Sequence, residues 1–455
     1  MAKYEQYAEY KNTGVSWIPE MPQGWQVTKL KYLIKNLESG VSVNAADYPK
    51  SEGEFGVLKT SCVYTREFRA EENKTVFEEE LSRVKCPVRA GSIIISRMNT
   101  PDLVGAAVYV TENYSNLYLP DRLWQTVYND DEAQSSKYLH YFMYLRGFRD
   151  QISNFAEGAS SSMQSISKED FLSINILLPT RDEQEGVANF LDHETAQIDT
   201  LIEKQQTLIQ LLKDKRQAVI SHAVTKGLNP DAPMKDSGVE WLGDVPEHWE
   251  VLAISKLTQK ITNGYVGPTR DILVKQGVPY VQATHIKRGN VNFDDAYFVT
   301  DNWSKKHSKS ILKKGDVLVV QTGAGTGDIG LVTEREEGYN CHALIILQPT
   351  TDLILGSYLS LILQSSYGYS TLYSIRTGGM HPHLNCGEVR YVKVPTPTID
   401  EQQKIVEYIE NMKSKFDELT RSAEKAIQLM QERRTALISA AVTGKIDVRG
   451  WQVPQ

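Results

Sequence analysis

Three closely spaced glycines are the first feature of the sequence that could take part in chemistry. Gly325, Gly327 and Gly330 follow the strand-like run DVLVVQT and satisfy the pattern G-x-G-x-x-G. In dinucleotide-binding folds this pattern brings a pyrophosphate to the N-terminus of a helix. The residues that follow, LVTEREEGYN, are typical of a strand and a turn instead. We therefore expect a glycine-rich loop, with a nucleotide-using transferase built on residues 317–330 as an alternative.

A histidine-containing segment could in principle bind a metal. The segment GGMHPHLNC offers His381, His383 and Cys386, but their spacing matches no common metal site. The chain contains no CxxC motif, since its four cysteines lie far apart, at Cys62, Cys86, Cys341 and Cys386. Free thiols fit a reducing cytoplasm. No P-loop, Asn-Pro-Pro-Tyr/Phe, GxSxG or HExxH motif occurs. We predict a non-catalytic chain with no metal and no bound cofactor.

Several polar stretches have the composition of nucleic-acid contacts. Arg, Lys, Asn and Gln read base edges, while hydroxyls and backbone N–H groups bind phosphates. The net charge of −7 argues only weakly against such contacts, because a local basic face can coexist with acidic helices. The candidates in the first half are Lys59, Thr60, Ser61, Tyr64, Arg66, Arg69, Arg97, Asn99, Arg122, Ser161 and Gln164. Those in the second half are Tyr265, Arg270, Gln282, Thr284, His285, Lys287, Arg288, Gln321, Thr322, Arg376, His381 and His383.

These candidates lie within a sequence that occurs twice. Residues 13–33, TGVSWIPEMPQGWQVTKLKYL, align with residues 237–257, SGVEWLGDVPEHWEVLAISKL, so that Trp25 pairs with Trp249. Further on, RAGSIIIS (89–96) matches KKGDVLVV (313–320). Such repetition predicts two domains of one fold. Because the candidate stretches fall at parallel positions with different residues, we expect two exchangeable readers.

A long helix is predicted at the end of each repeat. Pro179 and Pro395 precede these segments, and Gly227 and Gly444 are plausible stops. Asp182 and Asp400 are candidate N-caps or first-turn acids. The apolar seams comprise Ile198, Ile202, Ile209, Leu212, Val219 and Ala223, interrupted by Gln205 and Arg216, and Ile409, Met412, Phe416, Leu419, Ala423, Ile427, Met430 and Leu437. A helix of roughly 40 residues is a rod of about 60 Å. It must bury its seam, so we expect an antiparallel coiled coil with pseudo-twofold symmetry. The alternative is that each helix packs on its own domain.

The fold class is therefore α/β (α+β), with two globular domains that are each followed by a long helix. The expected boundaries are 1–180 and 229–398 for the domains, and 181–228 and 399–455 for the helical segments. Strands are expected at SIIIS (92–96), AAVYV (106–110), VLVVQT (317–322) and LIILQP (344–349). The N-terminus lacks the apolar core of a signal peptide, and no run of eighteen apolar residues occurs. We expect a cytoplasmic protein.

In its architecture the chain resembles the specificity subunits of Type I restriction-modification enzymes. The resemblance rests on LPTRDEQ and PTIDEQ before the helices, on RQAVISHAVTKG and RTALISAAVTGK at their ends, and on MPQGWQV and VPEHWEV at the domain entries. It implies two target-recognition domains that each read one half of a split site in double-stranded DNA. It implies helices that set the gap and dock two modification subunits.

The resemblance also places the chemistry on partner subunits. The modification subunits would bring S-adenosylmethionine, and restriction subunits, which act as motor and nuclease, could join with ATP and Mg²⁺. The segment MAKYEQYAEY is longer than domain entry requires, and its role stays open. A duplicated coiled-coil adaptor that binds no DNA is the alternative function.

Overall fold

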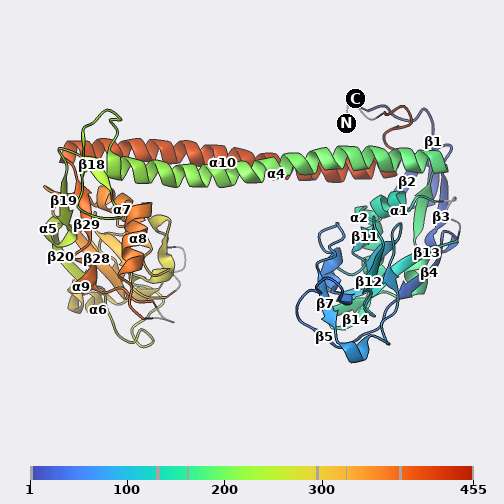
Figure 1. Ribbon diagram of the computed structural model, residues 1–455, viewed down its shortest axis with the longest axis horizontal. Helices are drawn as coiled ribbons and strands as arrows, with labels where there is room; N and C mark the ends of the chain where they lie inside the picture. The colour runs from blue at the N-terminus through green and yellow to red at the C-terminus, as the bar shows by residue number, and fades with distance from the viewer. Residues whose placement is uncertain are drawn as a thin grey trace. The chain divides into compact units, whose positions relative to one another are not determined.

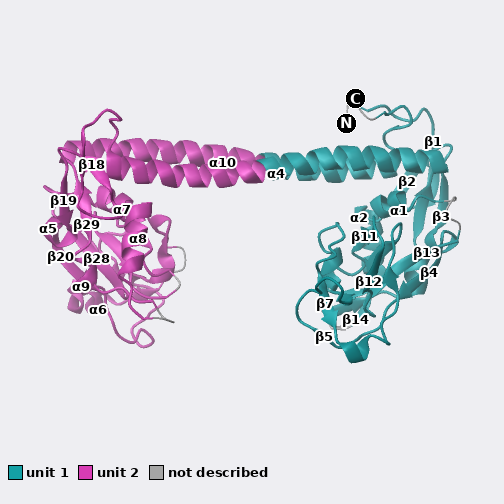
Figure 2. Ribbon diagram, in the orientation of Figure 1, with its two compact units in different colours: residues 1–204, 426–455 teal, residues 205–425 magenta. Residues whose placement is uncertain are grey.

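The chain folds into two compact units, each with a globular head. The computed structural model describes residues 4–129, 134–160, 163–293, 297–323, 325–378 and 382–452 (Figure 1). The first unit contains residues 1–204 and 426–455, and the second contains residues 205–425 (Figure 2). Two long helices, α4 (Arg181–Lys226) and α10 (Ile399–Val442), each contribute to both units. The predicted long helices are thus confirmed.

The first head is a mixed α/β domain with short helices and small sheets. Its helical elements are η1 (Leu30–Tyr32), η2 (Thr60–Val63), η3 (Glu78–Glu80), α1 (Ser136–Phe142), α2 (Arg146–Phe155) and α3 (Lys168–Ser173). Its strands are β1 (Tyr10–Val15), β2 (Ile18–Pro22), β3 (Gln26–Lys29), β4 (Ile34–Ser39), β5 (Ala45–Ala46), β6 (Gly56–Leu58), β7 (Asn73–Val76), β8 (Pro87–Val88), β9 (Ile93–Ser96), β10 (Met98–Asn99), β11 (Ala107–Tyr109), β12 (Tyr114–Tyr118), β13 (Leu123–Tyr128), β14 (Glu157–Ser160), β15 (Met163–Ser165) and β16 (Asn175–Leu178).

The second head has the same general plan. Its helical elements are α5 (Ile254–Leu257), η4 (Ala283–His285), α6 (Asp301–Lys306), η5 (Ser308–Ser310), α7 (Gly356–Gln364), α8 (Ser366–Ser374) and α9 (Cys386–Val389). Its strands are β17 (Met234–Asp236), β18 (Asp244–Pro246), β19 (Glu250–Ala253), β20 (Thr258–Asn263), β21 (Val278–Val281), β22 (Ile286–Lys287), β23 (Gly289–Val291), β24 (Phe298–Val299), β25 (Val317–Val320), β26 (Ile329–Leu331), β27 (Asn340–Cys341), β28 (Leu344–Pro349) and β29 (Lys393–Thr396).

A central antiparallel sheet is common to the two heads. Its strand order is β11-β9-β13-β4 in the first head, and the second head has the matching order β26-β25-β28-β20 within a six-stranded sheet. The apolar runs of the sequence form β9, β11, β25 and β28, as predicted. Ile93 and Ile95 enter one core cluster and Ile94 enters another. Because successive side chains of a strand point to opposite faces, a sheet buried on both faces needs such continuous apolar runs.

The two long helices pair in an antiparallel manner within each unit. In the first unit, Ile198 of α4 and Leu437 of α10 share one buried cluster, and the carboxylate of Asp199 lies 3.1 Å from Arg434 Nε. In the second unit, Ala223 of α4 and Ile409 of α10 share the other main cluster. The helices therefore pack on each other as well as on the heads.

The structure corrects the predicted seam at one residue and explains how the seam accommodates its polar interruptions. Leu419 is 51% exposed, so its assignment to the seam was wrong; Thr420, the next residue, is half-buried instead. The interruptions Gln205 and Arg216 are also half-buried. Arg216 is accommodated because its Nη1 donates to Asp417 Oδ1 of α10 at 2.6 Å.

In the described part of the chain, no helix is both long and apolar enough to span a bilayer.

Candidate nucleic-acid interface

A short strand pairing brings two distant candidates of the first head together. Strand β9 continues past Ser96 into β10, where Asn99 lies opposite Gln164 of β15. The Asn99 side chain donates from Nδ2 to Tyr64 Oη at 2.9 Å, and the Tyr64 hydroxyl contacts Thr60 Oγ1 at 2.9 Å. The structure therefore joins three of the predicted stretches into one polar cluster, in which Asn99 itself is buried.

The second head builds the same pairing from different residues. After β25, Thr322 forms an antiparallel bridge with His383, whose Nε2 lies 3.5 Å from Gln321 Nε2. The corresponding pair in the first head is Met98 with Ser165, because Ile166 N donates to Arg97 O there as Leu384 N donates to Gln321 O in the second head. One backbone arrangement thus pairs a thioether with a hydroxyl in one head and a hydroxyl with an imidazole in the other. This is a suitable geometry for two readers of different specificity.

The glycine-rich loop beside Thr322 is not a nucleotide cradle. The backbone amides of Thr326, Gly327 and Asp328 donate to carbonyls of the same loop and of β25. Strand β26, and not a helix, follows Asp328. The amides that would bind a pyrophosphate are therefore already used, as expected from the sequence.

Some candidates in the first head are exposed and others are engaged by acidic neighbours. Tyr64, Arg66 and Arg122 are exposed, and Lys59 and Arg97 are half-buried. Arg66 has a positive φ of 67°, and its guanidinium lies 4.9 Å from the Tyr144 ring centroid. In contrast, Ser61 donates to Glu72 and Arg69 pairs with Glu71. Those two side chains hold their own loop together.

The remaining candidates of the second head fall into exposed and buried groups. The exposed residues are Arg270, Thr284, Lys287 and Arg288. His285 is buried, and its Nδ1 accepts from the backbone N–H of the half-buried Gln282 at 2.9 Å. Tyr265 packs edge-on against Trp303 with ring centroids 5.0 Å apart. Two candidates, Ser161 and His381, lie outside the described residues.

Each head is fixed to the helices by a joint that the repeat motifs build. Trp25 Nε1 donates to Glu183 Oε1 at 3.4 Å, and Trp249 Nε1 donates to Glu401 Oε1 at 3.0 Å. The next residue, a buried glutamine, bridges the helix start to the head. For Gln402, Oε1 accepts from Leu355 N at 2.8 Å, and Nε2 donates to the carbonyls of Leu353 and Pro397.

Two buried tyrosines complete the joints and were not singled out from the sequence. The Tyr138 hydroxyl contacts the carbonyls of Leu177 and Val442, and the Tyr358 hydroxyl contacts those of Pro395 and Val224. Each tyrosine therefore ties the strand that precedes one long helix to the end of the other long helix. The repeat could have revealed these tyrosines, because they lie at equivalent positions of α1 and α7, and each of these helices precedes a DEQ motif.

The N-terminal segment, whose role was open, packs on the joint of the first head. Tyr7 is buried edge-on against Trp25, with centroids 5.7 Å apart. The Tyr4 hydroxyl donates to Glu194 at 3.0 Å, and Glu5 O accepts from Asp447 N at 2.8 Å. Residues 4–10 thus cover this joint.

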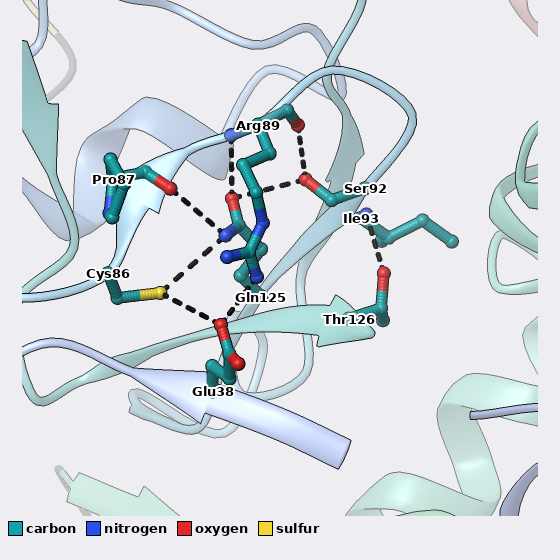
Figure 3. Close-up of polar contacts among 8 residues, drawn as sticks. All are labelled: Glu38, Cys86, Pro87, Arg89, Ser92, Ile93, Gln125 and Thr126. Atoms are coloured by element: carbon teal, nitrogen blue, oxygen red, sulfur yellow. Dashed lines mark hydrogen bonds and ion pairs between the residues drawn. The ribbon is translucent and has the colours of Figure 1, made fainter. Parts of the chain in front are cut away.

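A buried polar group supports the turn before β9 (Figure 3). Gln125 Oε1 accepts from Arg89 N at 3.0 Å and from Ser92 Oγ at 3.2 Å, while Nε2 donates to Pro87 O at 3.1 Å. Arg89 also forms an ion pair with Glu38. Burial raises the pKa of the nearby Cys86 thiol to about 11, so this cysteine is a poor nucleophile at neutral pH. These residues stabilise the scaffold.

Comparison with known proteins finds similarity to one kind of protein throughout. Residues 246–429 match the family model for the Type I restriction modification DNA specificity domain. The chain is 26% identical to the EcoBI specificity subunit of Escherichia coli, over 70% of this chain and 68% of that protein. It is 22% identical to the MjaVIII specificity subunit of Methanocaldococcus jannaschii, over 62% and 65%, and 21% identical to the putative MjaX specificity subunit of that organism, over 98% and 99%. The matches thus span about two thirds of the first two relatives.

Solved structures share the fold. A chain from a structural study of complex assembly and conformational transition in the type I R-M system superposes with a TM-score of 0.69 at 14% identity, covering 94% of this chain and 99% of that one. The HsdS subunit from Thermoanaerobacter tengcongensis gives 0.55 at 16% identity, covering 94% and 98%.

The fold and the site define a class of protein, a duplicated scaffold whose two heads carry different polar side chains at one structural position. Within this class, the chain is similar to the specificity subunits of Type I restriction-modification enzymes.

Proposed function

We propose that the chain reads a bipartite site in double-stranded DNA, with each head recognising one half. The observation that carries this proposal is the matched backbone pairing of Met98 with Ser165 in one head and of Thr322 with His383 in the other. Hydroxyl and imidazole groups can discriminate base edges through hydrogen bonds. A change of side chains on a constant backbone gives two half-sites of different sequence.

The long helices act in this proposal as a spacer between the half-sites. In support, each head contacts the start of one long helix and the end of the other. The first head joins the start of α4 and the end of α10. The second head joins the start of α10 and the end of α4. A pseudo-twofold arrangement requires the two helices to have equivalent positions in this way. Fixed joints and a stiff pair of helices would hold the gap constant.

The reaction itself is assigned to partner subunits. Two modification subunits would dock on the helices and bring S-adenosylmethionine, and restriction subunits, where present, would bring ATP and Mg²⁺. This chain would supply recognition and no catalytic group. The duplication of the helices supports two copies of one docking partner.

Exchange of one head is the experiment that tests the proposal. Residues 26–178 begin with β3 and end with β16, which pair with each other at the base of the first head. Residues 250–396 have the same bounds in the second head, where β19 pairs with β29. Each segment would be replaced by that of another family member, and methylated positions would be mapped in DNA from cells that also carry the modification subunit.

We expect each exchange to change one half-site and to leave the other half-site and the gap unchanged. A change in both half-sites would contradict independent reading. Binding of the modification subunit without any sequence-dependent methylation would support the adaptor function instead.

A further inference from the structure

The second head exposes an aromatic surface next to its candidate interface. Tyr369 and Tyr373 lie one turn apart on α8 and are 54% and 60% exposed. Their rings stack with centroids 6.2 Å apart and planes at 28°. The guanidinium of Arg376 lies 4.7 Å from the Tyr373 centroid, within the range of a cation–π contact. We call these three residues the aromatic platform.

The platform is joined to the residues that pair at the candidate interface. Arg376 Nη2 donates to the carbonyl of Thr326, and Thr326 Oγ1 donates to Pro382 O at 3.2 Å. A Cβ at Gly327 would lie 2.8 Å from Arg376 Nη2, so the loop can approach the arginine because this residue is glycine. The Thr322–His383 bridge flanks this loop. The platform is therefore linked to the candidate interface through the buried Thr326.

The platform is specific to the second head. Helix α2 of the first head corresponds to α8, because Ile152 and Leu372 are buried at equivalent positions. At the two tyrosine positions α2 has Arg149, which donates to Asp102 O at 3.0 Å, and Ser153. A surface for a partner that docks on both halves has to exist in both halves. A surface present in one head fits a ligand that only this head binds.

We propose that the aromatic platform contacts DNA, with the tyrosine rings packed against sugars and bases of the half-site read by the second head. This inference rests on the proposed function and adds Tyr369 and Tyr373 to the candidate contacts. In a duplex the base faces are stacked on each other, so the rings would pack against sugars and base edges, and the adjacent arginine adds attraction for the phosphates. Removal of both rings should lower the affinity for the cognate duplex by about tenfold.

Photocrosslinking tests the contact directly. Tyr373→p-benzoylphenylalanine would be placed in the full chain in complex with its modification subunit and the cognate duplex. The matched control is the same replacement at Tyr391, which is 69% exposed in the same head and outside the platform. We expect a DNA crosslink within the second half-site from position 373 and none from position 391. A crosslink to the modification subunit, a DNA crosslink outside this half-site, or no crosslink would overturn the proposal.

Affinity measurements separate this proposal from the proposed function. The double variant Tyr369→Ala/Tyr373→Ala should bind the cognate duplex about tenfold more weakly, whereas Tyr369→Phe/Tyr373→Phe and Tyr391→Ala should bind like the wild type. Discrimination against base changes in the first half-site should persist in the double alanine variant. Wild-type affinity in that variant would overturn the platform alone. Absence of sequence preference in the wild-type complex would overturn the proposed function.

Discussion

At the scale of single residues, the two side chains after Asp in each DEQ motif act on different neighbours. The glutamate accepts a hydrogen bond from a buried tryptophan, and the glutamine bridges the helix start to loops of the head. Trp249 and Leu355 belong to the head, so each of these bonds links the helix start to the head. The motif therefore defines a joint.

The buried glutamine gives a prediction for stability. Gln402→Ala would leave Leu355 N and the carbonyls of Leu353 and Pro397 without their side-chain partner. We expect a loss of about 2–4 kcal/mol in the free energy of unfolding, because unpaired buried polar groups are costly. Urea denaturation of the wild type and the variant measures this free energy of unfolding. The control Gln403→Ala removes an exposed side chain of the same helix and should change stability by less than about 0.5 kcal/mol. Equal losses in both variants would contradict the role of the joint.

A buried histidine gives a prediction for pH dependence. Burial lowers the pKa of His140 to about 4. The unfolded chain binds this proton near pH 6.5, while the folded chain stays neutral until about pH 4. The corresponding stability is therefore complete above pH 6.5 and lost as the pH falls toward 4, by about 3 kcal/mol. Urea midpoints from pH 7 to 4.5 should fall less steeply in His140→Gln than in the wild type. Parallel curves would show that another group causes the slope.

At the scale of elements, the sequence predicts the long helices and the repeated sheet better than the interface. Periodicity and flanking proline and glycine define α4 and α10, because these signals are local. Gly227 directly after α4 and Gly444 two residues after the end of α10 have φ values of 79° and 69°, as a glycine stop requires. The pairing of Asn99 with Gln164 joins residues far apart in the chain, and no local signal gives its register. For the same reason, the sequence alone does not show that Glu72 engages Ser61 or that His285 is buried.

The paired helices carry an ion pair in each unit that the repeat preserves. Arg216 pairs with Asp417 at 2.6 Å, and Arg434 pairs with Asp199 at 3.1 Å. These pairs are equivalent in the repeat, because Arg216 aligns with Arg434 and Asp199 aligns with Asp417 at one offset. The two ion pairs can form at the same time only in one antiparallel register of the two helices.

Charge reversal tests the ion pairs. Arg434→Asp places a carboxylate next to Asp199 and should destabilise the chain, whereas Asp199→Arg/Arg434→Asp should restore most of the loss. The coupling in a double-mutant cycle should be about 0.5–1 kcal/mol and should decrease with salt, since Asp199 is 41% exposed. Calorimetry at two salt concentrations measures it. Additive effects of the two substitutions would mean that the pair does not contribute.

At the scale of the whole molecule, the proposed spacer makes the length of the helices a determinant of the DNA gap. One heptad adds about 10 Å to a helix, which corresponds to about three base pairs of duplex. Insertions after Thr207 of α4 and after Lys425 of α10 lie opposite each other in the register given by the two ion pairs. Inserting a heptad at both sites should therefore preserve the seam and both joints.

Methylation of duplexes whose gap is varied one base pair at a time measures the effect of these insertions. We expect the optimal gap to lengthen by about three base pairs, while both half-site sequences stay the same. The control carries the heptad in α4 alone, which displaces the facing seams and should abolish methylation at every gap. An unchanged optimum in the doubly extended chain would show that the gap is set by contacts other than the paired helices.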